Sequence, residues 1–156
     1  MRTGPKLPKT AEYLTKAPIP SAVLILLFPK RDSFNFILTL RSKNVETHKG
    51  QISLPGGAQE GDESLEETAL REANEEIGVF PETVDIIGEL STIYVPYSGF
   101  KIYPYVGWTN STPNLKASAE EVEKIIIASI TELLNNDNQR KKNHSPQRPS
   151  NNHAIF

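Results

Sequence analysis

The sequence has 156 residues, a formal net charge of −2 and no cysteine. This length allows one domain with a buried core. The small net charge argues against a nucleic-acid partner, and the lack of cysteine excludes disulfides, thiolate nucleophiles and cysteine-bound zinc. The longest apolar run, residues 22–28, is too short to cross a membrane, so we expect a cytoplasmic protein without membrane contact.

The first part of the chain predicts a lead-in followed by strands. Residues 1–20 are rich in proline and lysine and predict an irregular lead-in. Residues 22–29 and 34–41 are apolar, partly β-branched runs separated by a polar turn, which predicts two strands. Residues 42–50 predict a polar loop, and residues 51–54 predict a short strand that a Pro-Gly-Gly sequence ends.

A helix is predicted over residues 64–77. Ser64 and Glu67 have the spacing of a capping box at its start, and Gly78 is suited to its end. Beyond it, residues 83–95 predict strand structure that is interrupted at Gly88.

Two further elements and a tail complete the expected domain. Residues 100–108 predict a strand, although Pro104 weakens this prediction for part of it. Residues 119–127 favour a strand or a helix, and residues 129–134 favour a short helix.

The composition then becomes rich in Asn, Lys, Arg and Pro, so residues 135–156 predict a polar, flexible tail. The expected domain therefore spans residues 21–134.

The predicted helix lies in the most acidic part of the chain. Eight of the seventeen residues from Glu60 to Glu76 are Asp or Glu. Such a run is often only a solvated helix face. Helical projection favours another interpretation, because Glu76 falls within the apolar stripe and Glu72 lies at its edge. The stripe consists of Leu65, Ala69, Ala73 and Ile77.

A carboxylate beside a core loses hydration, and clustered carboxylates raise one another's pKa. A bound divalent cation resolves both problems, and an all-oxygen ligand set favours Mg²⁺ or Mn²⁺. Glu72 and Glu76 share one face and are our first ligands. Arg71 faces another way, and we expect Glu63 and Glu67 to hold it as a structural partner.

The acidic segment resembles the Nudix box of the Nudix hydrolase superfamily. Its pattern runs Gly57-x5-Glu63-x7-Arg71-Glu72-Ala73-x-Glu75-Glu76-x-Gly78-Val79. Only Ala73 is smaller than the usual Ile, Leu or Val. The resemblance implies an α+β protein with the Nudix fold, an α/β/α sandwich around a mixed sheet. It also implies hydrolysis of a pyrophosphate bond with Mg²⁺ or Mn²⁺ as the cofactor.

In that family the Gly57 carbonyl often joins the metal ligands. Glu72, Glu75 and Glu76 are the expected carboxylate ligands, with Glu75 either a third ligand or the general base. The catalytic candidates are thus Glu75 and Glu76, while Glu63, Arg71 and Gly78 have structural roles in the box. Some members take the base from a distal loop, where this chain offers Glu120, Glu121 and Glu123.

A second resemblance narrows the substrate. Residues 37–42 and 48–57 are similar to the signature of the coenzyme A pyrophosphatase branch, and residues 94–106 resemble it as well. This implies cleavage of coenzyme A into 3′,5′-ADP and 4′-phosphopantetheine. The expected substrate-binding residues are Arg41, His48, Gln51 and Ser98.

The chain departs from this branch in places, which leaves alternatives open. Glu46 stands where many members have Arg, and Leu54 replaces the usual Phe. The substrate could instead be ADP-ribose or another nucleoside diphosphate derivative, and a non-catalytic ligand-binding module is a rival of another class. The expected partner is a small nucleotide, bound by a monomer or a homodimer. Similar proteins continue into a final helix, and the end at Phe156 leaves the presence of that helix open.

Overall fold

The computed structural model describes residues 17–43 and 50–135. Most of the predicted lead-in, the predicted tail beyond Asn135, and His48 lie outside the described residues. In the described part of the chain, no helix is long and apolar enough to cross a membrane.

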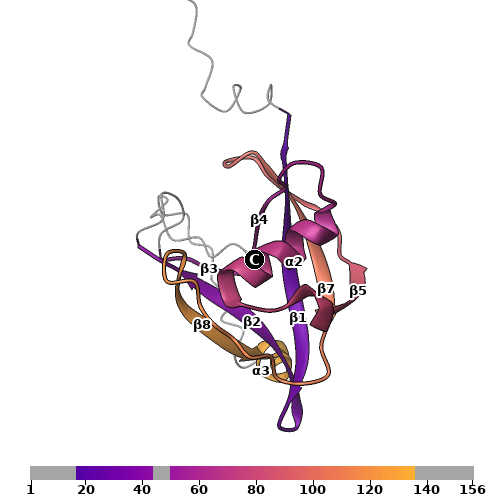
Figure 1. Ribbon diagram of the computed structural model, residues 1–156, viewed down its shortest axis with the longest axis vertical. Helices are drawn as coiled ribbons and strands as arrows, with labels where there is room; N and C mark the ends of the chain where they lie inside the picture. The colour runs from indigo at the N-terminus through magenta and orange to yellow at the C-terminus, as the bar shows by residue number, and fades with distance from the viewer. Residues whose placement is uncertain (1–16, 44–49, 136–156) are drawn as a thin grey trace, which may run out of the picture.

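A long hairpin organises the molecule (Figure 1). Its strands are β1 (Ile19–Lys30) and β2 (Ser33–Arg41), each longer than predicted. They pair with each other only beside their turn, from Phe28↔Asn35 to Lys30↔Ser33. Beyond that point β1 pairs with β4 and β7, while β2 pairs with β3 and β8. The hairpin therefore opens into two sheet halves.

The strands form a mixed sheet, as predicted. Its main order is β3-β2-β1-β7-β5, and β4, β6 and β8 pair with β1, β7 and β2. The contact between β1 and β7 is parallel and the others are antiparallel. The remaining strands are β3 (Ile52–Ser53), β4 (Gly56–Ala58), β5 (Asp85–Glu89), β6 (Ile93–Val95), β7 (Phe100–Trp108) and β8 (Val122–Ser129).

The predicted strand over residues 100–108 is confirmed as β7, and Pro104 does not break it. Pro104 lies inside β7, which runs between β1 and the shorter β5 and β6. β5 pairs with residues 105–108 of β7 and β6 with residues 100–102. The carbonyl of Pro104 accepts a hydrogen bond from the Leu90 N–H, in the connection between β5 and β6. Its nitrogen faces this same gap, where no ladder hydrogen bond is required of it.

The predicted interruption at Gly88 is present only as an irregularity in the register. Gly88 belongs to β5, and the register against β7 shifts between Ile86 and Gly88. Ile87 is the extra residue of this β-bulge, and β5 continues past it to Glu89.

The predicted helix is α2 (Leu65–Ile77), followed by the short helix η1 (Pro81–Thr83). Ser64 and Glu67 form the predicted capping box, and Gly78 ends the helix with φ 73°. The apolar side of α2 packs on β1, because Ala69, Ala73 and Ile77 are fully buried with alternate residues of that strand. Those strand residues are Ala22, Leu24, Leu26 and Phe28.

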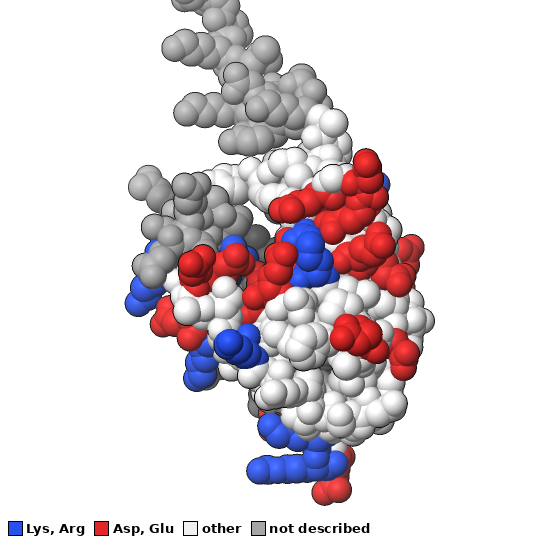
Figure 2. Space-filling model, viewed as in Figure 1, with Lys and Arg blue, Asp and Glu red and all other residues white. Residues whose placement is uncertain are grey.

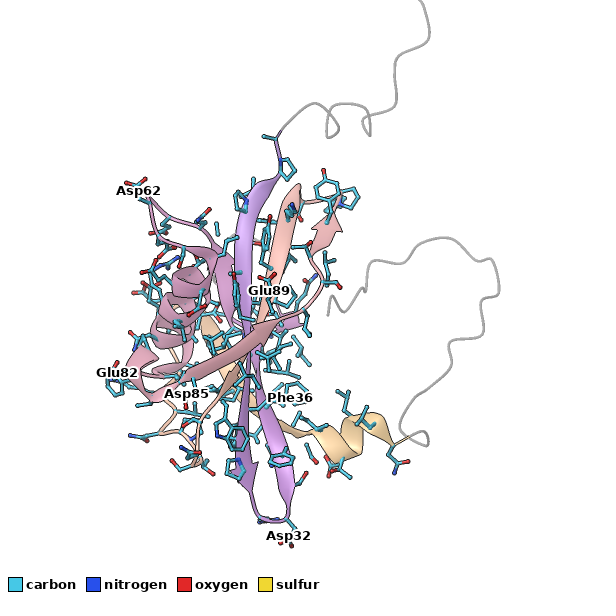
Figure 3. All side chains as sticks on the ribbon, turned by 90° about the vertical axis from the view of Figure 1, so that its right-hand side faces the viewer. Asp32, Phe36, Asp62, Glu82, Asp85 and Glu89 are labelled. Atoms are coloured by element: carbon cyan, nitrogen blue, oxygen red, sulfur yellow. The ribbon has the colours of Figure 1, made fainter. Side chains whose placement is uncertain are left out.

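The sheet separates two helical layers of unequal size. Figure 3 shows α2 on one side of the sheet and α3 (Ile130–Leu134) on the other. Helix α3 contacts β2, and residues 17–43 and 50–135 contribute no other helix to that face. The core therefore lies between α2 and β1, which fixes the acidic helix against the middle of the sheet.

Candidate functional site

Strand β4 brings the backbone of Gly57 against α2. It pairs with β1 through Gly57↔Ala22 and its neighbours. A Cβ atom on Gly57 would lie 2.2 Å from the Oε1 atom of Glu72. Glycine therefore leaves the space that the Glu72 carboxylate occupies, and any side chain there would push this carboxylate away.

Glu76 is the most deeply buried acid of the helix, with 1% of its surface exposed. Its Oε1 atom lies 3.4 Å from Nη1 of Arg41, a residue at the end of β2. Among the described residues, its Oε2 atom and the Nε atom of Arg41 have no hydrogen-bond partner. Burial raises the pKa of Glu76 to about 8, Arg41 opposes this shift, and Glu72 and Glu121 add to it by repulsion. The site thus holds an acid whose charge is incompletely compensated.

Glu72 is the second partly buried acid. Its Oε1 atom accepts a hydrogen bond of 3.1 Å from Arg71 Nη1. Burial raises the pKa of Glu72; Arg71 lowers it, and repulsion from Glu75 and Glu121 raises it further. Glu72 and Glu76 are therefore two neighbouring carboxylates that a cation would stabilise.

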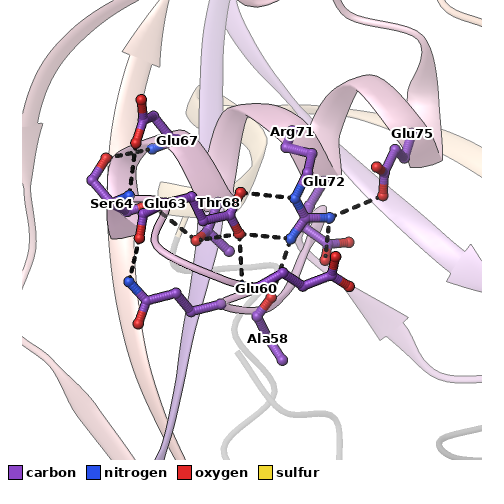
Figure 4. Close-up of polar contacts among 10 residues, drawn as sticks. Ala58, Glu60, Glu63, Ser64, Glu67, Thr68, Arg71, Glu72 and Glu75 are labelled. Atoms are coloured by element: carbon purple, nitrogen blue, oxygen red, sulfur yellow. Dashed lines mark hydrogen bonds and ion pairs between the residues drawn. The ribbon is translucent and has the colours of Figure 1, made fainter.

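Arg71 connects four parts of the segment (Figure 4). Nε and Nη2 donate to the two oxygens of Glu63 at 3.0 and 2.9 Å, and Nη2 also donates to the Ala58 carbonyl. Nη1 donates to Glu72 and, at 3.0 Å, to Glu75. This pairing lowers the pKa of Glu63 to about 2, with the Arg71 hydrogen bond as the largest cause. Arg71 thereby fixes α2 to the loop before it.

Part of the expected environment of Arg71 is wrong. Glu67 does not hold this arginine, because its carboxylate accepts the Ser64 N–H at 2.7 Å in the capping box. Arg71 does not face away from the other acids either, since it contacts both Glu72 and Glu75. The pairing with Glu63 is present as expected.

One of the three distal acids lies at the site. Glu121 precedes β8, and its carbonyl accepts the Ser42 N–H at 2.8 Å, directly after Arg41. Its charge acts on both Glu72 and Glu76. Glu121 is therefore the distal acid whose negative charge raises the pKa of both Glu72 and Glu76.

Two other predicted substrate-binding residues, Gln51 and Ser98, lie in different places relative to the acids. The carbonyl of Gln51 accepts the Arg41 N–H at 2.9 Å, which places Gln51 next to the site. Ser98 lies in the turn between β6 and β7, where its hydroxyl donates to the Val95 carbonyl. Ser98 thus belongs to a different connection from the acids.

The donor set fits a hard divalent cation. In the described part of the chain, no three Asp, Glu or His side chains already converge on one point. Arg41 binds Glu76, while Arg71 binds Glu72 and Glu75. The unpartnered Oε2 of Glu76 and the close approach of Gly57 to Glu72 are suited to oxygen ligation. Figure 2 shows the acidic side chains around α2, interrupted by basic ones.

A family comparison covers nearly all described residues. The sequence model of the NUDIX domain matches residues 18–149. Nudix hydrolase 22 from Arabidopsis thaliana is 38% identical over 80% of this chain and 42% of its own length. An uncharacterized Nudix hydrolase NudL from Enterobacter is 39% identical over 73% of this chain and 59% of its own length. The chain spans about half the length of such curated relatives.

Solved structures show the same fold at low sequence identity. An Ap4A hydrolase from C. elegans, in a binary complex, has a TM-score of 0.62 at 16% identity over 72% of this chain and 82% of its own. The NUDIX domain of NrtR from Shewanella oneidensis, complexed with ADP ribose, has a TM-score of 0.58 at 22% identity, covering 80% and 85% of the two chains. These similarities confirm the predicted fold class.

Proposed function

We propose, because this chain belongs to the Nudix family, that it hydrolyses a pyrophosphate linkage in a nucleoside diphosphate derivative. The observation that carries the proposal is the buried Glu76 carboxylate beside Glu72, with one oxygen unpartnered among the described residues. A solvated structural helix would not bury this acid, since an uncompensated buried charge is costly.

Glu72, Glu76 and the Gly57 carbonyl would hold the cation, with Glu75 as a further ligand. A bound Mg²⁺ or Mn²⁺ supplies neutralisation of phosphate charge and a lower pKa for a bound water. The chain's own contribution is mainly positioning, as phosphoryl chemistry requires.

Arg71 supplies much of that positioning. By binding Glu63 and the Ala58 carbonyl, it sets the distance between the glycine loop and α2. Glu75 and Glu121 are the candidates for the base that removes a proton from the attacking water. Glu75 already binds Arg71, whereas Glu121 lies in the turn directly before β8.

We infer that coenzyme A is the substrate, with 3′,5′-ADP and 4′-phosphopantetheine as products. The similarity of residues 37–42 and 48–57 to the coenzyme A pyrophosphatase branch supports this. The ligand named for the NrtR domain, ADP ribose, makes that compound the leading alternative.

A hydrolysis assay with product masses tests the proposal. The chain is incubated with Mg²⁺ and coenzyme A, ADP-ribose or Ap4A, beside Glu76→Gln and the exposed-acid control Glu82→Gln. We expect cleavage of coenzyme A by wild type and Glu82→Gln only. Faster cleavage of ADP-ribose rejects the substrate assignment. No cleavage of any compound with Mg²⁺ or Mn²⁺, by a folded chain, rejects the activity and favours a binding module.

A further inference from the structure

Arg41 is fixed by backbone hydrogen bonds, and its side chain reaches Glu76 in the site. Its N–H donates to the Gln51 carbonyl at 2.9 Å and its carbonyl accepts the Gly50 N–H at 3.1 Å. The next residue, Ser42, is bound to the carbonyl of Glu121. The Cα atom of Arg41 is thus fixed from two sides. Only rotation within the side chain can change where its guanidinium lies.

The contact between Arg41 and Glu76 is a weak version of an arginine–carboxylate pair. In the described part of the chain, the two side chains share one hydrogen bond, of 3.4 Å from Nη1 to Oε1. Strong pairs of this kind use two parallel N–H donors at shorter distances. Here Arg41 Nε and Glu76 Oε2 are buried and lack partners among the described residues. The pair therefore leaves one polar atom on each side unsatisfied.

The second arginine of the site behaves differently. Arg71 binds Glu63 through two donors and also binds Ala58, Glu72 and Glu75. Loss of its contact with one acid would leave the others in place. Within the described residues, the Arg41 side chain makes one hydrogen bond, to Glu76, so the two arginines differ in how readily they release a carboxylate.

The charge around Glu76 favours exchange of its partner. Glu72 and Glu121 both repel it, and one guanidinium offsets only part of the negative charge. A dication compensates two neighbouring carboxylates at once and can satisfy the second oxygen. However, the same dication is repelled by a guanidinium that stays within contact distance of Glu76.

We propose that Arg41 and the divalent cation are alternative partners of Glu76. Arg41 occupies the carboxylate when the cation is absent and leaves it when the cation binds. The released guanidinium then has its planar donors available for a phosphate oxygen of the substrate. This inference rests on the proposed function, because it assumes that the acids of α2 bind a cation.

Competition and a purely structural role for Arg41 predict opposite changes in cation affinity when Arg41 is removed. If Arg41 only held Glu76 in place for the cation, its removal would weaken cation binding. If Arg41 competes with the cation, its removal strengthens binding. The experiment is isothermal titration of the substrate-free chain with Mn²⁺.

Four proteins are compared: wild type, Arg41→Gln, Arg41→Lys and Lys124→Gln. Lys124 is an exposed cation on β8 and serves as the matched control for loss of one positive charge. We expect the Kd of Arg41→Gln for Mn²⁺ to fall about three- to tenfold, the range expected when one competing ion pair is lost. Arg41→Lys and Lys124→Gln should stay within about twofold of wild type.

An unchanged or higher Kd in folded Arg41→Gln overturns the proposal. No Mn²⁺ binding by wild type overturns the proposed function itself, and the inference with it. If Arg41→Gln does not fold, ¹⁵N NMR of the arginine side chains in wild type decides the matter. The Arg41 Nε signal should shift on titration with Mg²⁺, and an unmoved Arg41 signal contradicts the exchange.

Discussion

At the scale of single residues, Glu76 links stability to pH. Its pKa is raised to about 8 by burial, whereas an unfolded chain has the ordinary value of about 4.5. The folded state therefore binds a proton more tightly than the unfolded state. Without a cation, stability should be greatest below pH 4.5, as far as this group is concerned, and should fall as the pH rises towards 8.

We predict that the loss of stability with rising pH is absent from Glu76→Gln. Thermal unfolding in EDTA at several pH values between 5 and 8.5 measures it. The melting temperature of wild type should fall, relative to that of Glu76→Gln, as the pH rises through this window. Glu82→Gln, an exposed acid on η1, should follow wild type. Parallel curves for wild type and Glu76→Gln would show that Glu76 is solvated.

Arg71 tests the importance of fork geometry at a single residue. Arg71→Lys keeps the positive charge but cannot donate to both oxygens of Glu63 and to the Ala58 carbonyl together. We predict a loss of about ten- to hundredfold in kcat, the range found when a group that orients metal ligands is removed. Steady-state kinetics measure this loss. The control is Lys116→Arg, which makes the reverse exchange at another basic residue. Full activity in Arg71→Lys would mean that charge alone suffices.

At the scale of elements, β4 and α2 must approach closely for the acids to gather. Gly57→Ala would place a Cβ atom 2.2 Å from Glu72 Oε1, so we predict that Glu72 is displaced and that turnover falls by at least about tenfold. Gly88→Ala is the matched control, since an added Cβ meets nothing within 4 Å there. Circular dichroism separates this effect from unfolding. Normal turnover in Gly57→Ala would exclude Glu72 from the site.

Elements with local signals were predictable from the sequence. The capping box at Ser64 and the glycine at Gly78 fix the ends of α2 through contacts within a few residues, and both are present. The role of Pro104 was not predictable, because it depends on β5 and β6 ending on either side of it. The sequence shows which strand contains the proline, but it does not show which strands pair with that strand.

At the scale of the whole molecule, the site depends on contacts between distant segments. The box itself gives Glu63, Arg71, Glu72 and Glu76 in one stretch, and their spacing predicted a cation site. The approach of Arg41 and Glu121 follows from the pairing of β2 with β8, where Arg41 lies opposite Val122. No local pattern identifies that pairing, so Glu121 could not be separated from Glu120 and Glu123 by sequence.

The clustered negative charge of the acids predicts how the stability of the whole fold responds to a cation. A cation that binds only the folded chain stabilises it by about 2.7 kcal/mol at a hundred times its Kd. We predict that saturating Mg²⁺ raises the melting temperature of wild type at pH 8, where the acids are most costly. Glu72→Gln should show a smaller rise and Glu76→Gln little or none, because each removes a ligand charge. Equal rises in all three proteins would mean that Mg²⁺ acts elsewhere on the folded surface, and the acids of α2 would then be no cation site.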